Sequence, residues 1–343
     1  MITDRTQQAR SLFKDLKPYR VKQLYKALFQ ENIGSFLDIT TFPKDMRTKL
    51  DKDIPFLYYK DFTTVGDKVN LSYKAKLILL DDREIETVLM KNKDNHFTVC
   101  LSTQIGCAVG CLFCATGSMG FKRDLLMDEI IDQLRFWMIF IKNRKLQGKV
   151  TNLVFMGMGE PLLNYENTRD AINTILDSTE IGKNHIALST VGIISSLYKM
   201  LNDKTWPDIK IAISLQNANY EARKKLIPKT DLDFPKEIVK WSKKYLKKYN
   251  RRSNFITIEY ILIKNINDTV NDVERLSRLL QKIPRVKVNL IPFNETKGKF
   301  KRPDKEKIKE FKLRLEQKRI TTTLRESKGQ DISAACGQLI VKT

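Results

Sequence analysis

The distribution of apolar and polar residues divides the chain into two regions with different periodicity. In residues 8–55 apolar side chains recur at helical spacing, and Pro43 and Pro55 interrupt and close this region. The clearest helical stretch carries Tyr19, Val21, Leu24, Tyr25, Leu28 and Phe29. Shorter runs alternate between apolar and polar residues, which predicts β-hairpins at 62–65, 69–80 and 85–90. Residues 1–94 are therefore expected to form an accessory domain of helices and hairpins.

From about residue 95 the pattern changes to an alternation of strands and helices. The predicted strands are 97–102, 152–155, 186–189, 209–214, 255–262 and 286–291. The helical stretches between them include 127–142, 165–177, 235–248 and 270–282. Such alternation predicts βαβ units around a parallel sheet, either open or closed into a barrel. We expect an α/β core at 95–300 and a C-terminal extension at 301–343, with one further strand at 321–325.

Chemically unusual residues follow the carboxyl ends of these predicted strands. They are the cysteines after the first strand, residues 157–160 after the second, Ser189 and Thr190 at the third, residues 214–216 at the fourth, and Asn294 after the sixth. The carboxyl ends of parallel strands meet at one edge of a sheet, where side chains from several strands converge. The sequence therefore predicts an active site at that edge.

The charge of the chain indicates a polyanionic partner. The 343 residues include 62 Lys and Arg against 40 Asp and Glu, a formal net charge of +22. Lysine and arginine release condensed counterions when they meet phosphates, so nucleic acid is the expected partner. Basic residues gather at 223–225, 243–252 and 297–309. The alternative is a lysine-rich composition inherited from an AT-biased genome, with these residues on ordinary solvated faces.

Membrane insertion, secretion and a disulfide framework are not expected. The most apolar run, residues 136–141, is far shorter than the roughly 20 residues that a spanning helix needs. The first residues contain no apolar segment typical of a secretory signal. Five cysteines in a chain of this length, three of them clustered, do not resemble a disulfide scaffold. We therefore expect a protein of the reducing cytoplasm.

Three of the cysteines form a metal-binding pattern. Cys107, Cys111 and Cys114 form a CxxxCxxC run in a glycine-containing loop. Three thiolates can hold three irons of a [4Fe–4S] cluster and leave the fourth iron open to S-adenosylmethionine (SAM). Zinc is the alternative, and it would need a fourth ligand. That ligand would be His96, His185, Cys100, Cys336 or a carboxylate; three ordinary buried cysteines are the remaining possibility.

The surroundings of this run resemble one family closely. The segment TVCLSTQIGCAVGCLFCATGSMGFKRDL is similar to the RlmN/Cfr family of radical SAM RNA adenine methyltransferases. The likeness continues in FMGMGEPLLN at 155–164, LSTVGI at 188–193, NLIPFN at 289–294, DISAACGQL at 331–339 and the N-terminal YRVKQLYKALFQ. The resemblance covers nearly the whole chain. It implies a partial (βα)6 TIM-like radical SAM barrel, with an N-terminal accessory domain that binds RNA.

The resemblance also implies roles for the two remaining cysteines. Cys336 would accept a methyl group from one SAM, and a second SAM would be cleaved to a deoxyadenosyl radical that abstracts hydrogen from this methyl. The resulting carbon radical would add to adenine. Cys100 would help to deprotonate the intermediate and would release the product by forming a disulfide with Cys336. Glu86 matches a glutamate suggested as a base. Without the resemblance, Cys100 and Cys336 would be small buried hydrophobes and Glu86 a polar strand residue.

Further residues match the family's SAM contacts, and two positions depart from its pattern. The implied contacts are Gly159, Glu160, Ser189, Ser214, Leu215, Gln216 and Asn294. Gln216 stands where the family usually has histidine, and Ser333 where it usually has aspartate. Glutamine still offers a donor and an acceptor but no ionisable ring. The departures leave the chemistry in place and bear on SAM binding and on the substrate.

The implied substrate is adenine 2503 of 23S ribosomal RNA, methylated at C2 before the ribosome is fully assembled. Adenine 37 of transfer RNA is left open as a second target. The resemblance further implies a flavodoxin or ferredoxin as electron donor, a monomer, and no membrane partner. One alternative is methylation of C8, the antibiotic-resistance activity of the Cfr branch. An alternative of another class is a non-catalytic, zinc-containing RNA-binding protein.

Overall fold

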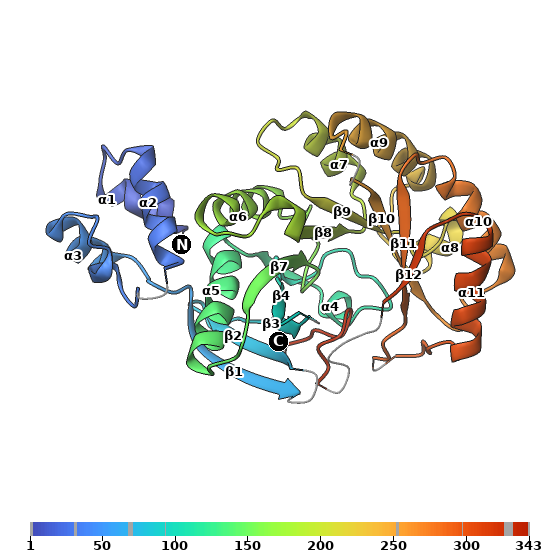
Figure 1. Cartoon of the computed structure of the whole chain (residues 1–343), viewed down its shortest axis with the longest axis horizontal. Helices are drawn as coiled ribbons and strands as arrows, with labels where there is room; N and C mark the ends of the chain where they lie inside the picture. The colour runs from blue at the N-terminus through green and yellow to red at the C-terminus, as the bar shows by residue number, and fades with distance from the viewer. Residues whose placement is uncertain are drawn as a thin grey trace.

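A computed structural model describes residues 3–30, 33–67, 71–92, 94–251, 254–296, 298–325 and 332–341. The chain begins with three short helices, α1 (Arg5–Leu12), α2 (Pro18–Leu28) and α3 (Lys44–Asp53). These helices stand at one end of the molecule beyond α5 (Met127–Asn143), as Figure 1 shows. The helices predicted for this region are therefore present. Within the described parts of the chain, no helix has the length and apolarity needed to cross a bilayer.

The predicted parallel core is confirmed. Its strands are β4 (His96–Cys100), β7 (Lys149–Phe155), β8 (Ile186–Thr190), β9 (Lys210–Ser214), β10 (Ile256–Leu262), β11 (Val286–Pro292) and β12 (Thr322–Leu324). They are neighbours in this order, and every pair among them is parallel. The covering helices are α5, α6 (Tyr165–Ser178), α7 (Ile194–Asn202), α9 (Phe234–Lys248), α10 (Val270–Leu280) and α11 (Lys305–Gln317). Figure 1 shows them around the outside of the curved sheet.

The predicted hairpins belong to the same sheet as the core. The strands β1 (Tyr59–Asp67), β2 (Ser72–Leu79) and β3 (Glu84–Lys91) form an antiparallel meander. β3 then pairs with β4 in antiparallel fashion, with Val88 opposite Cys100. The described sheet runs from β1 at one edge to β12 at the other, so it forms an open, partial barrel. The sheet is continuous across residue 94, where the boundary of the accessory domain was expected; the domain limits themselves stay predictions.

Burial on both faces explains why the central strands read as apolar runs. All seven residues of β10 are buried, because helices cover one face and the barrel interior covers the other. The outer helix α10 is amphipathic and buries one face with Val273, Leu276 and Leu280, whereas α5, which lies between the N-terminal helices and the sheet, is buried on nearly all sides. This packing fixes the strand ends, and with them the loops that follow the carboxyl edge.

Buried ion pairs attach the N-terminal helices to the core. Arg5 of α1 is fully buried and pairs with Asp128 and, at 2.6 Å, with Asp132 on α5. Arg135 pairs with the same Asp132 at 2.8 Å and donates to the carbonyl oxygen of Leu28 at 3.1 Å. Removing one partner of a buried pair typically costs about 3–5 kcal/mol, because the other charge is left uncompensated. The orientation of α1 and α2 on the core therefore depends on these charges.

Candidate active site

The three clustered cysteines lie on a loop that follows β4. The loop is flanked by a small hairpin of β5 (Gln104–Gly106) and β6 (Phe121–Asp124), and it ends in α4 (Ala115–Ser118). The Cys107 N–H donates to the Gly120 carbonyl oxygen at 2.9 Å. Gly106 has φ +74°, and a Cβ there would lie 1.8 Å from the same oxygen, so only glycine permits this closure. The backbone therefore holds the cysteine loop against the barrel edge.

The environment of these cysteines is apolar. Their partners include Val109, Phe113, Leu226, Ile261 and Phe293. Burial raises the pKa of the Cys107 thiol to about 12 and raises the pKa of Cys111 and Cys114 as well. Each of these thiols is therefore protonated at neutral pH unless a metal displaces the proton.

The two histidines considered as a fourth zinc ligand lie away from the cysteine loop. Within the described residues, no three His, Cys, Asp or Glu side chains are placed to share a single metal ion. His96 is exposed at the first residue of β4, and His185 lies just before β8 with its Nδ1 2.9 Å from Asn152 Oδ1. Both histidines thus lie at the amino edge of the sheet, opposite the cysteine loop. Zinc needs converging ligands, whereas the thiolates of a cluster each bind a different iron.

Gly159 and Glu160, two predicted SAM contacts, form the turn after β7. Gly159 has φ +98°, and a Cβ there would come within 2.5 Å of the Gln104 side chain, so glycine is required. The Glu160 carboxylate is buried and accepts from Thr190 Oγ1 at 2.6 Å and from the Val191 N–H at 2.8 Å. In the described structure Glu160 therefore joins the ends of β7 and β8; its contact with SAM stays a prediction.

The next three predicted contacts lie where β8 and β9 end. The hydroxyl oxygens of Ser189 and Ser214 are 3.3 Å apart, so these two residues do meet at the edge of the sheet. Leu215 is fully buried and its N–H donates to the carbonyl oxygen of Glu259 on β10 at 3.1 Å.

Gln216, which departs from the family pattern, has a structural partner. It is buried at φ +57°, and its Oε1 accepts from the Ile261 N–H at 2.6 Å. Its carbonyl oxygen accepts from Asn267 Nδ2 at 2.7 Å. Gln216 therefore holds the loop after β9 against β10, and its acceptor oxygen is engaged by the protein itself.

The segment that carries Cys336 lies against the cysteine loop. The Ala115 N–H, one residue after Cys114, donates to the Gly337 carbonyl oxygen at 2.8 Å. Thr116 Oγ1 donates to the Leu339 carbonyl oxygen at 2.7 Å. Asn294 Nδ2 donates to the carbonyl oxygen of Cys336 at 3.1 Å. The first two bonds join residues 222 and 223 apart in sequence, and Asn294, which follows β11, contacts the Cys336 segment.

Glu86, on β3, also contacts the C-terminal segment. Its Oε1 pairs with Lys74 Nζ at 2.9 Å, and its Oε2 accepts from the Ile340 N–H at 2.9 Å. Lys74 Nζ also donates to the Ser333 carbonyl oxygen at 3.2 Å. The side chains of Glu86 and Lys74 are 6% and 14% exposed, so this pair is largely shielded from water. Glu86 therefore anchors the C-terminal segment here, and its role as a base stays a prediction.

Cys100 and Cys336 belong to the same interior region. Cys100 is buried at the end of β4, and burial, followed by the neighbouring Cys336, raises its pKa to about 12. Burial also raises the pKa of Cys336 to about 11, and Arg325 opposes the shift in both thiols. All five cysteines are free thiols in the structure, so the disulfide implied for product release stays a prediction.

Sequence reasoning missed Arg325 as a site residue. It directly follows β12, its N–H donates to the Leu290 carbonyl oxygen at 2.9 Å, and its Nη1 lies 3.4 Å from Met156 Sδ. The position at the end of a predicted strand was the available signal. The same rule selected the serines at the ends of β8 and β9.

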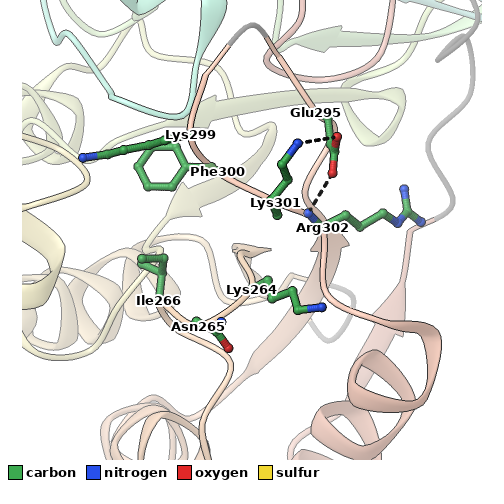
Figure 2. A pocket seen from close by; sticks show the side chains of 8 residues that line it. All are labelled: Lys264, Asn265, Ile266, Glu295, Lys299, Phe300, Lys301 and Arg302. Carbon is green, nitrogen blue, oxygen red and sulfur yellow. Dashed lines mark hydrogen bonds and ion pairs between the residues drawn. The ribbon is translucent and has the colours of Figure 1, made fainter.

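A basic pocket lies at the same edge, next to the ends of β10 and β11. Its volume is about 680 Å³. Figure 2 shows the side chains that line it. Lys264 pairs with Asp304 at 3.0 Å and Lys301 with Glu295 at 3.5 Å. The side chains of Lys299 and Arg302 extend away from Glu295 (Figure 2). The lining residues are Lys264, Asn265, Ile266, Glu295, Lys299, Phe300, Lys301 and Arg302.

The structure modifies the predicted basic surface. The pocket contains most of the cations at the start of the group 297–309, although Lys297 itself lies outside the described residues. The group 243–252 covers the end of α9, and Arg252 also lies outside the described residues. In the group 223–225 the prediction of a surface cation is wrong for Arg223, which is completely buried, whereas Lys224 and Lys225 are exposed.

Comparison with known proteins relates this chain to radical SAM enzymes, and its curated relatives are RNA methyltransferases. The model of the "Radical SAM superfamily" matches residues 101–280. A probable dual-specificity RNA methyltransferase RlmN from Aquifex aeolicus is 38% identical over 331 residues, 94% of this chain and 91% of the relative. The corresponding protein of Dictyoglomus turgidum is 40% identical over 327 residues, 94% and 90% of the two chains.

A solved structure agrees. A radical SAM methyltransferase from Sphaerobacter thermophilus matches with a TM-score of 0.86 and 33% identity, over 98% of this chain and 97% of the other. This likeness includes the N-terminal helices and the C-terminal segment as well as the barrel. The chain therefore belongs to the radical SAM superfamily and, within it, to the RlmN family.

Proposed function

We propose that this enzyme methylates C2 of an adenine in 23S ribosomal RNA, with transfer RNA as a second substrate class, and that each turnover consumes two molecules of SAM. The observation that carries the proposal is the contact between the Cys336 segment and the cysteine loop. The Ala115–Gly337 hydrogen bond of 2.8 Å links the residues that directly follow Cys114 and Cys336. A methyl carrier next to a radical source is the arrangement that this chemistry requires.

Cys107, Cys111 and Cys114 would hold the iron–sulfur cluster, which supplies the electron that cleaves SAM. The thiols of Cys336 and Cys100 would carry the methyl group and release the product. The sulfur of Cys336 takes the methyl group of the first SAM and loses its proton, and S-adenosylhomocysteine leaves. Adenine C2 is too poor a nucleophile to take this methyl directly, so a carbon radical formed on the Cys336 methyl group provides the route.

Cys100 would complete the cycle. After the carbon radical has added to C2, the adduct loses the C2 proton, with Cys100 as the base, and gives up its unpaired electron to an acceptor such as oxidised flavodoxin or ferredoxin. Attack of the Cys100 sulfur on the Cys336 sulfur then forms a disulfide and breaks the bond between the Cys336 sulfur and the methylene carbon. That carbon then takes a proton, and two electrons from a donor such as flavodoxin or ferredoxin restore the thiols. The raised pKa of Cys100 means that it rests as a neutral thiol, so it must lose a proton before it acts.

RNA recognition is supported by charge and by the position of the basic pocket. The net charge of +22 favours a polyanion, and Lys264, Lys299, Lys301 and Arg302 lie at the edge where the cysteines gather. Phosphates beside the target nucleotide would bind there, while the adenine is extruded into the barrel interior. We also propose that the enzyme acts as a cytoplasmic monomer.

Replacing Lys299 and Arg302 together by alanine is expected to weaken RNA binding. Each lost phosphate contact reduces the slope of log affinity against log salt by about one, so the double variant should reduce it by about two. Fluorescence anisotropy with a labelled RNA fragment at several salt concentrations measures the affinity and its salt slope. The control is Lys149→Ala, at the amino edge, which removes only an exposed pair with Glu180. An unchanged slope in the double variant would exclude the pocket as a phosphate contact.

Product analysis tests the proposed reaction itself. Ribosomal RNA from strains with and without the gene is digested to nucleosides and separated by mass spectrometry. We expect 2-methyladenosine only where the gene is present, because the chain belongs to the RlmN family. A methyl group at C8 without one at C2 would assign the enzyme to the Cfr-like activity. A colourless protein that contains zinc and leaves RNA unmodified would indicate a binding module instead.

A further inference from the structure

Arg223 is a buried cation whose contacts are all with neutral groups. It lies on the short helix α8 (Tyr220–Lys224) and is fully buried. Its Nη1 donates to the Ser214 carbonyl oxygen at 2.7 Å, its Nη2 to the Val191 carbonyl oxygen at 2.6 Å, and its Nε to Thr230 Oγ1 at 2.8 Å. Its Cζ lies 3.8 Å from the centre of the Phe234 ring. The N–H donors of the guanidinium therefore have acceptors, but none of these acceptors carries a negative charge that would balance its positive charge.

The lack of an anionic partner distinguishes Arg223 from the other deeply buried arginines. Arg5 and Arg135 each pair with Asp132, at 2.6 and 2.8 Å. In the described residues, by contrast, no carboxylate forms an ion pair with Arg223. Burial lowers the pKa of Arg223 to about 9, so the group still carries its charge at neutral pH. An isolated buried charge is costly, and such a charge is normally retained for an opposite charge that it faces.

The cysteine loop is the candidate for the negative charge that Arg223 faces. A thiolate at Cys111, one of the proposed cluster ligands, would be the foremost of the negative charges that act on Arg223, ahead of Asp231 and Glu160. The Leu112 N–H, next to Cys111, donates to the Leu226 carbonyl oxygen at 3.0 Å. The Leu226 N–H in turn donates to the Arg223 carbonyl oxygen at 2.9 Å. Cys111 and Leu226 also share one apolar cluster, so little water screens the two charges.

We propose that Arg223 is the counter-charge of the iron–sulfur cluster and raises the potential at which the cluster accepts an electron. Three thiolates give the loaded site a negative charge, and one-electron reduction makes that charge more negative by one. A fixed positive charge in a dry environment stabilises the reduced form more than the oxidised form. Arg223 is thus a positioning residue that also sets the driving force for reduction. This inference rests on the proposed cluster ligands Cys107, Cys111 and Cys114.

The Arg223 side chain also contacts the edge of the sheet where SAM is predicted to bind. Its acceptors Ser214 and Val191 lie at the ends of β9 and β8, among the predicted SAM contacts. A purely structural role would need only these hydrogen bonds. An electrostatic role needs the charge as well, and substitutions can separate the two.

The test is a redox titration of the cluster, followed by electron paramagnetic resonance in anaerobically reconstituted protein. Arg223→Gln keeps amide donors but removes the charge, and we expect a lower midpoint potential than in the native protein. Arg223→Lys keeps the charge with fewer donors, and its potential should stay near the native value. Arg251→Gln, which alters an arginine paired with Asp208 ahead of β10, is the matched control and should change nothing.

A second pair of variants leaves Arg223 in place, so this test remains possible even if the Arg223 variants do not fold. Thr230→Asp puts a carboxylate next to the Arg223 Nε and neutralises its charge, whereas Thr230→Asn is nearly isosteric and uncharged. Only the aspartate variant should lower the midpoint potential. Equal potentials for these two, or equal shifts for Arg223→Gln and Arg223→Lys, would overturn the counter-charge role. A native protein without iron after reconstitution would instead overturn the cluster ligands on which the inference rests.

Discussion

Replacing Cys336 by alanine is expected to abolish methyl transfer to RNA, with a loss on the order of 10³-fold or more. The substitution removes the only atom that accepts the methyl group in the proposed mechanism. The segment should stay docked, because its contacts with Asn294 and Ala115 use the backbone carbonyl oxygens of Cys336 and Gly337. Methyl incorporation from labelled SAM into an RNA substrate measures the effect.

The neighbouring Ser333 provides the control for this variant. Ser333 is exposed, and Lys74 contacts its backbone carbonyl oxygen rather than its hydroxyl. Ser333→Ala should therefore retain activity while changing the same segment. An active Cys336→Ala protein would refute the role of Cys336 as methyl carrier, and loss of activity in both variants would point to a general effect on the segment.

Replacing Cys111 by alanine is expected to remove the iron–sulfur cluster and, with it, all SAM cleavage. Cys111 is buried in an apolar cluster of side chains, and the other two proposed ligands, Cys107 and Cys114, are partly buried against the same cluster. Iron and sulfide analysis, the brown absorbance and the release of 5′-deoxyadenosine measure the loss. Cys107→Ala and Cys114→Ala should behave in the same way.

The two histidines are the controls that separate a cluster from zinc. His96 and His185 lie at the amino edge of the sheet, so alanine at either position should leave the iron content unchanged. Full iron loading and activity in the Cys111→Ala protein would contradict the proposed ligands. Zinc in place of iron in the native protein would favour the alternative of a zinc site.

The parallel core could be predicted because each strand is a short apolar run between amphipathic helices. Burial on both faces leaves β10 mostly apolar, with Thr257 and Glu259 as its buried polar residues, and most of the candidate site residues follow the strand ends. The elements inside the cysteine loop could not be predicted in this way. β5 and α4 have three and four residues, too few for any periodicity to appear.

The pairing of β3 with β4 and the buried charges depend on tertiary structure. Periodicity identifies a strand but not its partner, so the hairpins were expected in a separate domain although they extend the core sheet. Arg5 reads as a surface cation next to the N-terminus, yet it pairs with Asp128, 123 residues further along. Arg223 likewise reads as one of three consecutive basic residues, although it is the only one of them that is buried.

The sequence identified which residues lie in the candidate site, but it did not identify the groups that their side chains contact. The resemblance selected Glu86, Glu160 and Gln216, and all three lie at the edge or interior of the barrel. Their side chains, however, have protein partners: Lys74 and Ile340 for Glu86, Thr190 and Val191 for Glu160, and Ile261 for Gln216. A sequence motif identifies a position, whereas hydrogen-bond partners follow from the folded backbone around it.

Reaction with SAM that carries a trideuterated methyl group tests the proposed chemistry most directly. Purified, reconstituted enzyme is incubated with reductant and RNA, and the digested nucleosides and 5′-deoxyadenosine are analysed by mass spectrometry. One deuterium leaves the methyl group of Cys336 when hydrogen is abstracted, so we expect it in 5′-deoxyadenosine. The 2-methyladenosine should then carry two deuterons in its methyl group. A methyl group with all three deuterons would contradict transfer through Cys336.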